Sequence, residues 1–213
     1  MSTWPAYEIL KDAAHRWPNN PAIYDDHGTI SFQQLYTEAE ELRLQLMKLG
    51  IKEGMGIGVM AANGRNFIIG IFAAVGTGAT VMPMSPQLKA AEIDDMLEQA
   101  KLHAIIDDRS SIQPLDTVEA VIPMQQGAFR FAFTGVDASV AFAPFVQQPA
   151  FIRFTSGTTG KSKGVIVSHQ SVIDRVAGAN NGLQLGPGDT VIWVLPMAYH
   201  FMVSIILYVK FGA

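Results

Sequence analysis

Apolar residues recur at helical spacing in two stretches near the start of the chain, which predicts two helices that face a core. The first stripe consists of Leu10, Ala13, Ala14 and Trp17, and the second consists of Leu35, Ala39, Leu42, Leu46 and Leu49. The second helix is predicted to begin after Ser31, which forms a capping box with Gln34, and to end at Gly50. Between the two helices, residues 22–24 and 29–32 flank the sequence DDHG, which predicts a short β-hairpin.

Short apolar runs alternate with helical segments in the middle of the chain. The runs 57–60, 81–83 and 104–107 predict strands, whereas 67–75 and 90–100 predict helices. Alternation of this kind implies an α/β fold in which a mostly parallel sheet is flanked by helices on both faces.

The same alternation returns near the end of the chain. Residues 150–155, 164–167 and 190–195 predict three more strands. A helix is expected from 170 to 181, with Gly182 as its cap.

The stretch 118–149 lies between these two parts and predicts no definite element, because Phe, Val and Ala alternate there with turn residues. We therefore place a subdomain boundary at its end. An amino-terminal α/β subdomain would occupy 1–149, and a second subdomain, truncated at its carboxy end, would occupy 150–213.

The uncharged stretch 67–84 is long enough to be mistaken for a membrane span. Gly76, Gly78 and Pro83 divide it into a helix and a strand, which favours a buried α/β core. The amino terminus MSTWPAYEILKD has neither a basic head nor a long apolar run, so it lacks the pattern of a secretory signal. We expect a cytoplasmic protein without a membrane span.

Composition excludes several chemistries. The 213 residues include no cysteine, so disulfides, thiolate catalysis and cysteine zinc sites are ruled out. The formal net charge is −4 and there is no basic block, which argues against nucleic acid as a partner.

The stretch 154–165 reads FTSGTTGKSKGV and is dense in hydrogen-bond donors. Glycines let a backbone bend sharply and approach a ligand closely, and hydroxyl, amide and ammonium groups all donate to anions. This mixture is suited to a polyphosphate.

Three other interpretations of this stretch fit less well. A P-loop needs a glycine in place of Thr155 and a helix after the loop, where the sequence GVIV favours a strand. A serine-hydrolase elbow needs a glycine two residues before Ser156, and Phe154 stands there. An ordinary hairpin turn needs only one or two glycines, without the additional hydroxyls and lysines.

FTSGTTGKSKGV resembles the phosphate-binding signature of the adenylate-forming superfamily, which comprises acyl- and aryl-CoA synthetases, nonribosomal peptide adenylation domains and firefly luciferase. The signature, (S/T)-S-G-(S/T)-T-G-x-P-K-G-V, matches residues 155–165 except that Ser162 takes the proline position. GATVMPMSP is similar to a second motif of the superfamily, with Gly78 and Ala79 in swapped order. The resemblance covers nearly the whole chain and implies the amino-terminal part of the large domain of such an enzyme.

The resemblance implies an acid–thiol ligase of the acyl- or aryl-CoA synthetase type. Carboxylate oxygen attacks the α-phosphorus of ATP, pyrophosphate leaves, and the acyl-adenylate passes to the thiol of coenzyme A or of an acyl carrier protein. The residues that would bind the nucleotide are Thr155, Ser156, Gly157, Thr158, Thr159, Gly160, Lys161 and Lys163. Hydroxyls would donate to the β- and γ-phosphates, glycine amides would approach them, and Lys163 or Lys161 would supply the charge. Magnesium would arrive with ATP, because it binds phosphates with few protein ligands.

The segment LPMAYHFMVSI resembles the part of the superfamily that places an aromatic residue or a histidine near the acyl pocket. This implies that His200, with Tyr199 beside it, is a catalytic residue that orients the carboxylate. A histidine packed on an apolar face is the open alternative. His169 is expected to be a helix-entry residue. The other histidines, His15, His27 and His103, lack metal-ligand spacing, so no protein-held metal is predicted.

The adenine, ribose and hinge motifs of the superfamily, and the domain that carries its catalytic lysine, do not occur in this sequence. We expect the chain to be the amino-terminal fragment of a longer ligase, inactive by itself. Its apolar final stretch, 195–213, is expected to promote self-association. The alternative is a noncatalytic module that binds a nucleotide or a partner through the same loop.

Overall fold

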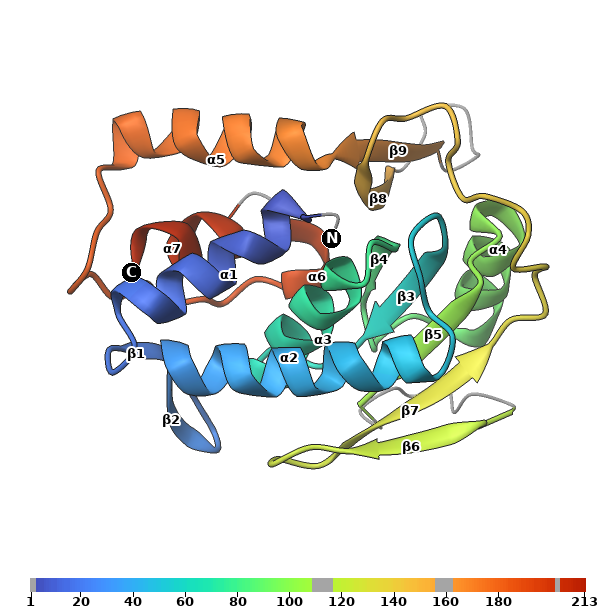
Figure 1. Ribbon diagram of the computed structural model, residues 1–213, viewed down its shortest axis with the longest axis horizontal. Coiled ribbons are helices and arrows are strands. Elements are labelled where there is room, and N and C mark those ends of the chain that lie inside the picture. The colour runs from blue at the N-terminus through green and yellow to red at the C-terminus, as the bar shows by residue number, and fades with distance from the viewer. Residues whose placement is uncertain (1–2, 109–116, 156–162, 202–203) are drawn as a thin grey trace.

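The computed structural model describes residues 3–108, 117–155, 163–201 and 204–213, and its main sheet has seven strands. In Figure 1 this sheet lies on the right. The strand order is β6-β7-β5-β3-β4-β8-β9. The strands are β3 (Gly56–Met60), β4 (Thr80–Met84), β5 (Ala104–Asp107), β6 (Ala120–Pro123), β7 (Ala128–Phe133), β8 (Pro149–Thr155) and β9 (Lys163–Ser168). The pairs β3–β4, β3–β5 and β4–β8 are parallel, and the outer pairs are antiparallel. The predicted α/β sheet with a parallel centre is confirmed.

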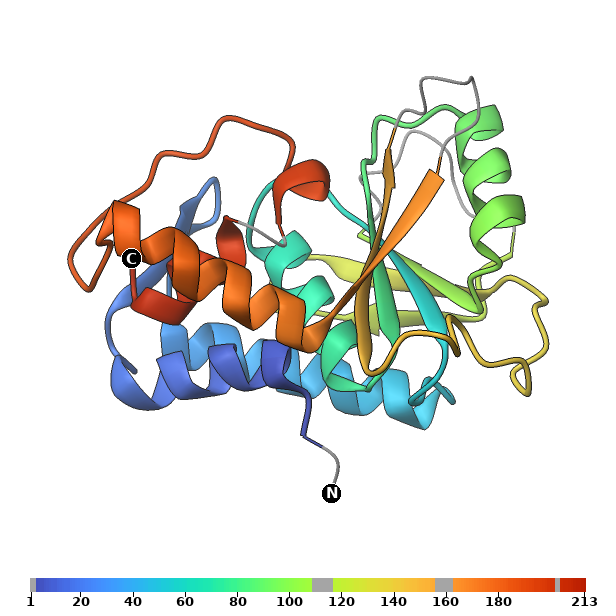
Figure 2. The same cartoon turned by 90° about the horizontal axis from the view of Figure 1, so that it is seen from above.

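Helices cover both faces of this sheet, as predicted. They are α1 (Pro5–Arg16), α2 (Phe32–Lys48), α3 (Arg65–Gly76), α4 (Ala90–Ala100), α5 (His169–Leu183), α6 (Met197–His200) and α7 (Ile205–Phe211). Alternate strand residues enter two separate apolar clusters: Val81 of β4 packs with α3, whereas Met82 and Met84 pack with Ile93 of α4. In Figure 2, α4 (green) lies on one side of the strands, and α2 and α3 (blue to teal) lie on the other.

The buried helix α3 explains the uncharged stretch of the sequence. Eleven of its 12 residues are buried, so it lies inside the protein core, and β4 follows it. A Cβ added to Gly70 would lie 3.0 Å from Val59 of β3 and 3.1 Å from the ring of Phe129, so glycine permits close packing on the sheet. None of the described helices is long and apolar enough to cross a membrane.

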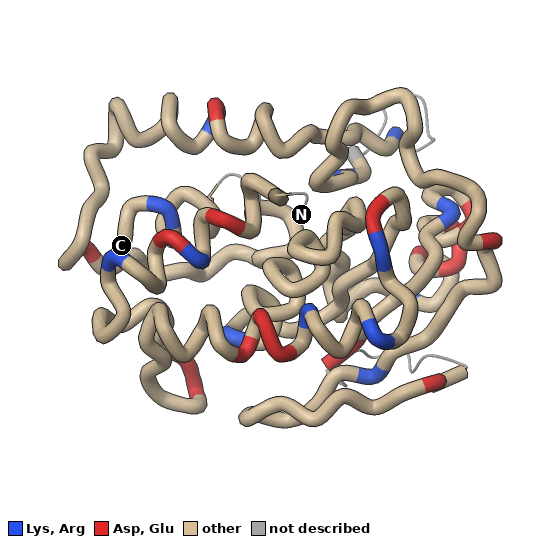
Figure 3. The backbone as a smooth tube through the Cα atoms, in the orientation of Figure 1, with Lys and Arg blue, Asp and Glu red and all other residues tan. Residues whose placement is uncertain are grey.

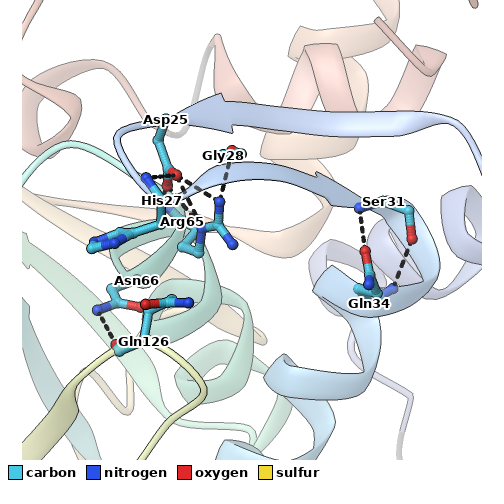
Figure 4. Close-up of polar contacts among 8 residues, drawn as sticks. All are labelled: Asp25, His27, Gly28, Ser31, Gln34, Arg65, Asn66 and Gln126. Atoms are coloured by element: carbon cyan, nitrogen blue, oxygen red, sulfur yellow. Dashed lines mark hydrogen bonds and ion pairs between the residues drawn. The ribbon is translucent and has the colours of Figure 1, made fainter.

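The start of α2 has the predicted capping box. Ser31 Oγ accepts a hydrogen bond from Gln34 N at 3.2 Å, and Ser31 N donates to Gln34 Oε1 at 2.9 Å (Figure 4). The helix ends before Gly50, whose φ of 101° favours glycine. The predicted hairpin before this helix is also present, as β1 (Pro21–Asp25) paired with β2 (Gly28–Ser31).

A buried ion pair joins this hairpin to the start of α3 (Figure 4). Arg65 Nη2 donates to Asp25 Oδ1 at 2.6 Å and to the carbonyl of Gly28 at 2.8 Å, and Arg65 N donates to Asp25 Oδ2 at 3.0 Å. Burial raises the pKa of Asp25, but the hydrogen bonds from Arg65 outweigh this effect and hold the pKa below its usual value. Asp25 therefore caps the first turn of α3 while neutralising the arginine.

One predicted strand is absent, and one pair of strands was not predicted. No strand forms in the described segment 190–195, which pairs with no strand and in which Ile192 and Val194 are 86% and 81% exposed. Apolar alternation favours an extended chain, but a strand also needs a partner for its backbone groups. Residues 118–149, where no element was predicted, contain the antiparallel pair β6–β7, with Phe129 and Phe131 on its buried face.

Helix α5 is longer than predicted. It continues to Leu183, past Gly182, and Gln184 is the capping residue with φ 56°. The side-chain amide of Asn180 bonds both backbone groups of Leu185, at 2.9 and 3.0 Å, so the turn forms after the helix has passed the glycine.

The subdomain boundary at 149/150 stays a prediction. β8 and β9 lie on the far side of that boundary and extend the same sheet through the parallel pairing of β8 with β4.

The last helix packs against the first. Figure 1 shows α7 beside α1, and the ring of Trp17 packs on Gly212 after α7.

His169 begins α5, as predicted, and is fully buried. Its Nδ1 accepts a hydrogen bond from Ala6 N at 3.2 Å, so the imidazole joins α5 to α1. Its ring lies 5.6 Å from that of Trp4. Burial lowers the pKa of His169 to about 4, because a protonated imidazole would be poorly solvated there.

The pKa of His169 predicts acid sensitivity. Between about 6.5 and about 4 the unfolded chain binds a proton at this residue and the folded chain does not, so the free energy of unfolding falls as pH decreases through this range. The loss attributable to His169 amounts to about 3 kcal/mol. Urea unfolding at several pH values would measure it. His169→Asn keeps an acceptor near the Nδ1 position for Ala6 and is expected to flatten the pH dependence, whereas His15→Asn, at an exposed position, is expected to leave it unchanged.

Candidate active site at the carboxyl edge of the sheet

Three neighbouring parallel strands end at one edge of the sheet. Met60 of β3 pairs with Met84 of β4, and Val81 of β4 pairs with Phe151 of β8. The chain leaves β3 for α3 on one face and leaves β4 for α4 on the other, so the two strands form a topological switch point. In open α/β sheets, ligands bind in the crevice outside the carboxyl ends of strands at such a point.

The loop that connects β8 to β9 starts and ends at this same edge of the sheet. Thr155 is the last residue of β8 and Lys163 is the first residue of β9, and the two are cross-strand partners. The prediction that the donor-rich stretch joins two strands is therefore confirmed. Because β9 is a strand, the P-loop and the serine-hydrolase elbow, which both lead into a helix, do not fit.

The structure places only part of the predicted nucleotide site. Thr155 and Lys163 flank the loop, and Lys163 is exposed at its base. The remaining predicted residues, Ser156, Gly157, Thr158, Thr159, Gly160 and Lys161, lie outside the described residues.

His200 is the last residue of α6 and is half-buried. Its ring lies 5.8 Å from the ring of Trp193, in an edge-on arrangement, and Trp193 also lies 6.0 Å from Tyr208. α6 is in contact with β4, the strand beside β8. The helix that ends with His200 contacts β4, and the β8–β9 hairpin pairs with β4 through β8. His200 and the hairpin are therefore close to the same strand, although more than 30 residues separate them in the sequence.

Phe201, directly after His200, lies at the centre of an aromatic cluster. Its ring is 5.8 Å from Phe67 and 5.6 Å from Phe72, both on α3, and 6.3 Å from Phe151 on β8. The side chains of these residues are fully buried. This cluster connects α6 to α3 and to the strand that leads into the predicted phosphate loop.

Sequence reasoning missed Asn63, which lies just beyond the end of β3. Its side-chain amide donates to Leu195 O at 2.8 Å and accepts from Met197 N at 2.9 Å. The position of Asn63 between an apolar strand and the apolar helix α3 was a sequence signal, because a polar residue at the carboxyl end of a central strand is well placed for a site.

Two cavities of the described structure are notable, and the larger of them is lined by Asn63, Trp193 and Met197, beside the carboxyl end of β3. One, of about 690 Å³, lies between the β1–β2 hairpin, residues 188–193 and α7, and the other, of about 510 Å³, lies between α4 and the β8–β9 hairpin. Lys163 and His200 line neither of these cavities, and Phe154 and Gly164 of the β8–β9 hairpin line the second one.

Charge and metal-ligand patterns add no second site among the described residues. Figure 3 shows basic and acidic residues interspersed along the chain. No group of three or more His, Asp or Glu residues in the described part could hold a metal ion. His103 accepts from Gly56 N at 2.9 Å and bonds Val140 O at 2.9 Å, so it serves the fold.

The structure is thus an α/β fold with a donor-rich hairpin at the carboxyl edge of its parallel strands, and this geometry is the basis for assigning the class of protein. Residues 10–213 match the family model described as AMP-binding enzyme, and the chain belongs to this family. The predicted membership of the adenylate-forming superfamily is therefore confirmed.

Relatives with curated descriptions include proteins of peptide synthesis. Gramicidin S synthase 2 of Brevibacillus brevis is 26% identical over 212 residues, which cover 97% of this chain and 5% of the relative. Dapdiamide synthesis protein DdaD of Enterobacter agglomerans is 30% identical over 168 residues, which cover 79% of this chain and 26% of the relative. The chain therefore spans a minor part of the length of these relatives.

Solved structures share the fold. The N-terminal domain of FACL13 from Mycobacterium tuberculosis has a TM-score of 0.79 at 21% identity, over all of this chain and 56% of that one. A four-domain nonribosomal peptide synthetase, AB3403, solved with AMP and glycine, has a TM-score of 0.76 at 20% identity, over all of this chain and 16% of that one.

The aromatic cluster predicts a strong effect of truncating Phe201. Phe201→Ala would remove a buried ring with three aromatic neighbours and is expected to lower the free energy of unfolding by about 3–5 kcal/mol. Tyr199→Ala, two residues earlier at an exposed position, is expected to cost less than about 1 kcal/mol. Urea unfolding of both variants would measure the difference. Equal costs would contradict the central place of Phe201.

Proposed function

We propose that the protein activates a carboxylic acid with ATP, forming an acyl-adenylate and releasing pyrophosphate, as part of an acid–thiol ligase. The observation that carries the proposal is the hairpin whose strand ends, Thr155 and Lys163, pair at the carboxyl edge of the parallel strands. Family membership supports the same chemistry. Catalysis of such a transfer consists mainly of positioning the reactants and neutralising charge on phosphate oxygens.

The proposed nucleotide-binding residues divide into three kinds. The hydroxyls of Thr155, Ser156, Thr158 and Thr159 donate to the β- and γ-phosphates. Gly157 and Gly160 let backbone N–H groups approach the same oxygens. Lys163 supplies the point charge, with Lys161 as the second candidate. Magnesium enters with ATP, bound mainly by the phosphates and water.

His200 is proposed to orient the carboxylate of the acid toward the α-phosphorus. Its half-buried position at the end of α6 leaves part of the imidazole accessible, and its ring is supported by Trp193. A histidine packed on an apolar face stays the alternative.

The acceptor of the acyl group is proposed to be the thiol of a carrier protein. The similarity to gramicidin S synthase 2 and to the peptide synthetase AB3403 favours this acceptor, since the resemblance to nonribosomal peptide adenylation domains implies loading of a carrier protein. Coenzyme A remains the sequence-based alternative. A cytoplasmic location and self-association stay predictions. The expected reason for self-association, exposure of the apolar stretch 195–213, does not hold for Ile205, Ile206 and Val209, which are buried. Exposed apolar side chains occur just before that stretch, at Ile192 and Val194.

Acid-dependent ATP–pyrophosphate exchange would test the proposed activity. The complete gene product should catalyse exchange with at least one acid from a panel of amino, aryl and fatty acids, and residues 1–213 alone should not. Transfer to a carrier protein or to coenzyme A would then identify the acceptor. Nucleotide binding without exchange under any condition would favour the noncatalytic module.

Lys163→Met tests the charge at the base of the loop. Loss of a charge-assisted hydrogen bond is worth about 1.5–3 kcal/mol, so we expect kcat/KM for exchange to fall by about 10- to 100-fold. Lys48→Met, on an exposed position of α2, is the matched control and should retain wild-type activity. Equal activities of the two variants would exclude Lys163 from the site.

A further inference from the structure

Asn63 caps a helix that is distant in the sequence. α6 is only four residues long, and its own N-cap residue, Pro196, has no side-chain capping hydrogen bond. The first N–H group of a helix lacks a partner within the helix. Here Met197 N donates to Asn63 Oδ1 at 2.9 Å, so a side chain from the end of β3 supplies the missing cap.

The same amide also holds the residue before Pro196. Asn63 Nδ2 donates to Leu195 O at 2.8 Å, so one planar group bonds a carbonyl and an N–H two residues apart. These two bonds join segment 190–197 to the end of β3. The segment is not paired with a strand, so the amide of Asn63 supplies two hydrogen bonds of the kind that a neighbouring strand would otherwise provide.

Asn63 is itself held firmly in place. It lies between the end of β3 and Gly64, the N-cap of α3, whose φ of 144° favours glycine. The next residue, Arg65, is fixed by the ion pair with Asp25. The orientation of the amide is therefore determined by the sheet and by α3.

α6 thus has an anchor at each end. Asn63 holds Met197 at its start, and the aromatic cluster holds Phe201 directly after its last residue. His200 lies between the two anchors, 5.8 Å from Trp193, which belongs to the tethered segment. Displacement of the first anchor would therefore change both the position of His200 and its contact with Trp193.

We propose that Asn63 is a positioning residue for His200. It acts through the backbone of residues 195–197 and does not itself contact the substrate. The role requires a donor and an acceptor in one side chain, which an amide supplies and a carboxylate or an aliphatic side chain does not. The catalytic part of this inference rests on the function proposed above.

Two substitutions and a matched control test the proposal. Asn63→Asp keeps the size of the side chain and the acceptor for Met197 but loses the donor for Leu195, and Asn63→Ala loses both. The control is Asn66→Ala, three residues along, whose amide donates to Gln126 O at 3.0 Å in the turn between β6 and β7 (Figure 4). It removes a hydrogen bond of the same chemistry that leads to a different part of the fold.

The first readout is the imidazole resonance of His200 in NMR spectra of the chain, assigned by its loss in His200→Gln. The ring current of Trp193 displaces this resonance in the wild type. We expect Asn63→Asp and Asn63→Ala to move it toward the value of a solvated histidine, and Asn66→Ala to leave it in place. An unmoved resonance in both Asn63 variants would overturn the proposal. So would unfolding of both variants alongside a folded Asn66→Ala, because Asn63 would then be a general structural residue.

The second readout is ATP–pyrophosphate exchange by the complete gene product. We expect Asn63→Asp to lower kcat by about tenfold or more while KM for ATP changes less than about threefold, since misplacement of a catalytic group acts on the reaction step. A displaced resonance with wild-type kcat would overturn the catalytic role. Absence of exchange in the wild type would refute the proposed function instead, and the NMR result would still decide whether Asn63 positions His200.

Discussion

The packing of Phe201 against three other aromatic rings is the contact on which the geometry of the candidate site depends. Phe67 and Phe72 belong to the buried helix α3, and Phe151 belongs to β8, which ends at the predicted phosphate loop. Aromatic pairs in such arrangements contribute about 0.5–1.5 kcal/mol each beyond their buried area. Because His200 precedes Phe201 directly, this cluster relates the proposed carboxylate-orienting residue to the hairpin that would hold the phosphates.

A second constraint begins at the β1–β2 hairpin. A buried arginine without a partner would be strongly destabilising, and Asp25 provides both the opposite charge and a cap for the first turn of α3. This fixes the junction between β3 and α3, from which Asn63 reaches the segment before α6. The switch point between β3 and β4 is therefore bordered by α6, which is held from two directions.

Elements with strong local signals were predictable in detail. The capping box at Ser31 and Gln34 and the alternation of buried strands with helices required no knowledge of distant contacts. The segment 190–195 shows the limit of such reasoning, because its apolar alternation is real but pairing depends on a neighbouring strand. β6 and β7 show the converse case. Their local sequence did not indicate strands, but they form strands because β7 pairs with β5 and with β6. In the site, the donor-rich hairpin was predictable from composition, whereas the tether from Asn63 was not.

Periodicity and contiguous residue types were sufficient to establish the class of fold, the family and the position of the donor-rich loop between two strands, because each of these is encoded locally along the chain. Only the tertiary structure revealed which distant segments of the chain contact one another. Packing brings Phe151 and Phe201 together and aligns the amide of Asn63 with Leu195 and Met197, more than 130 residues away. Such contacts arise from the formation of a common core, whose long-range pairings leave no periodic pattern in the residues that make them.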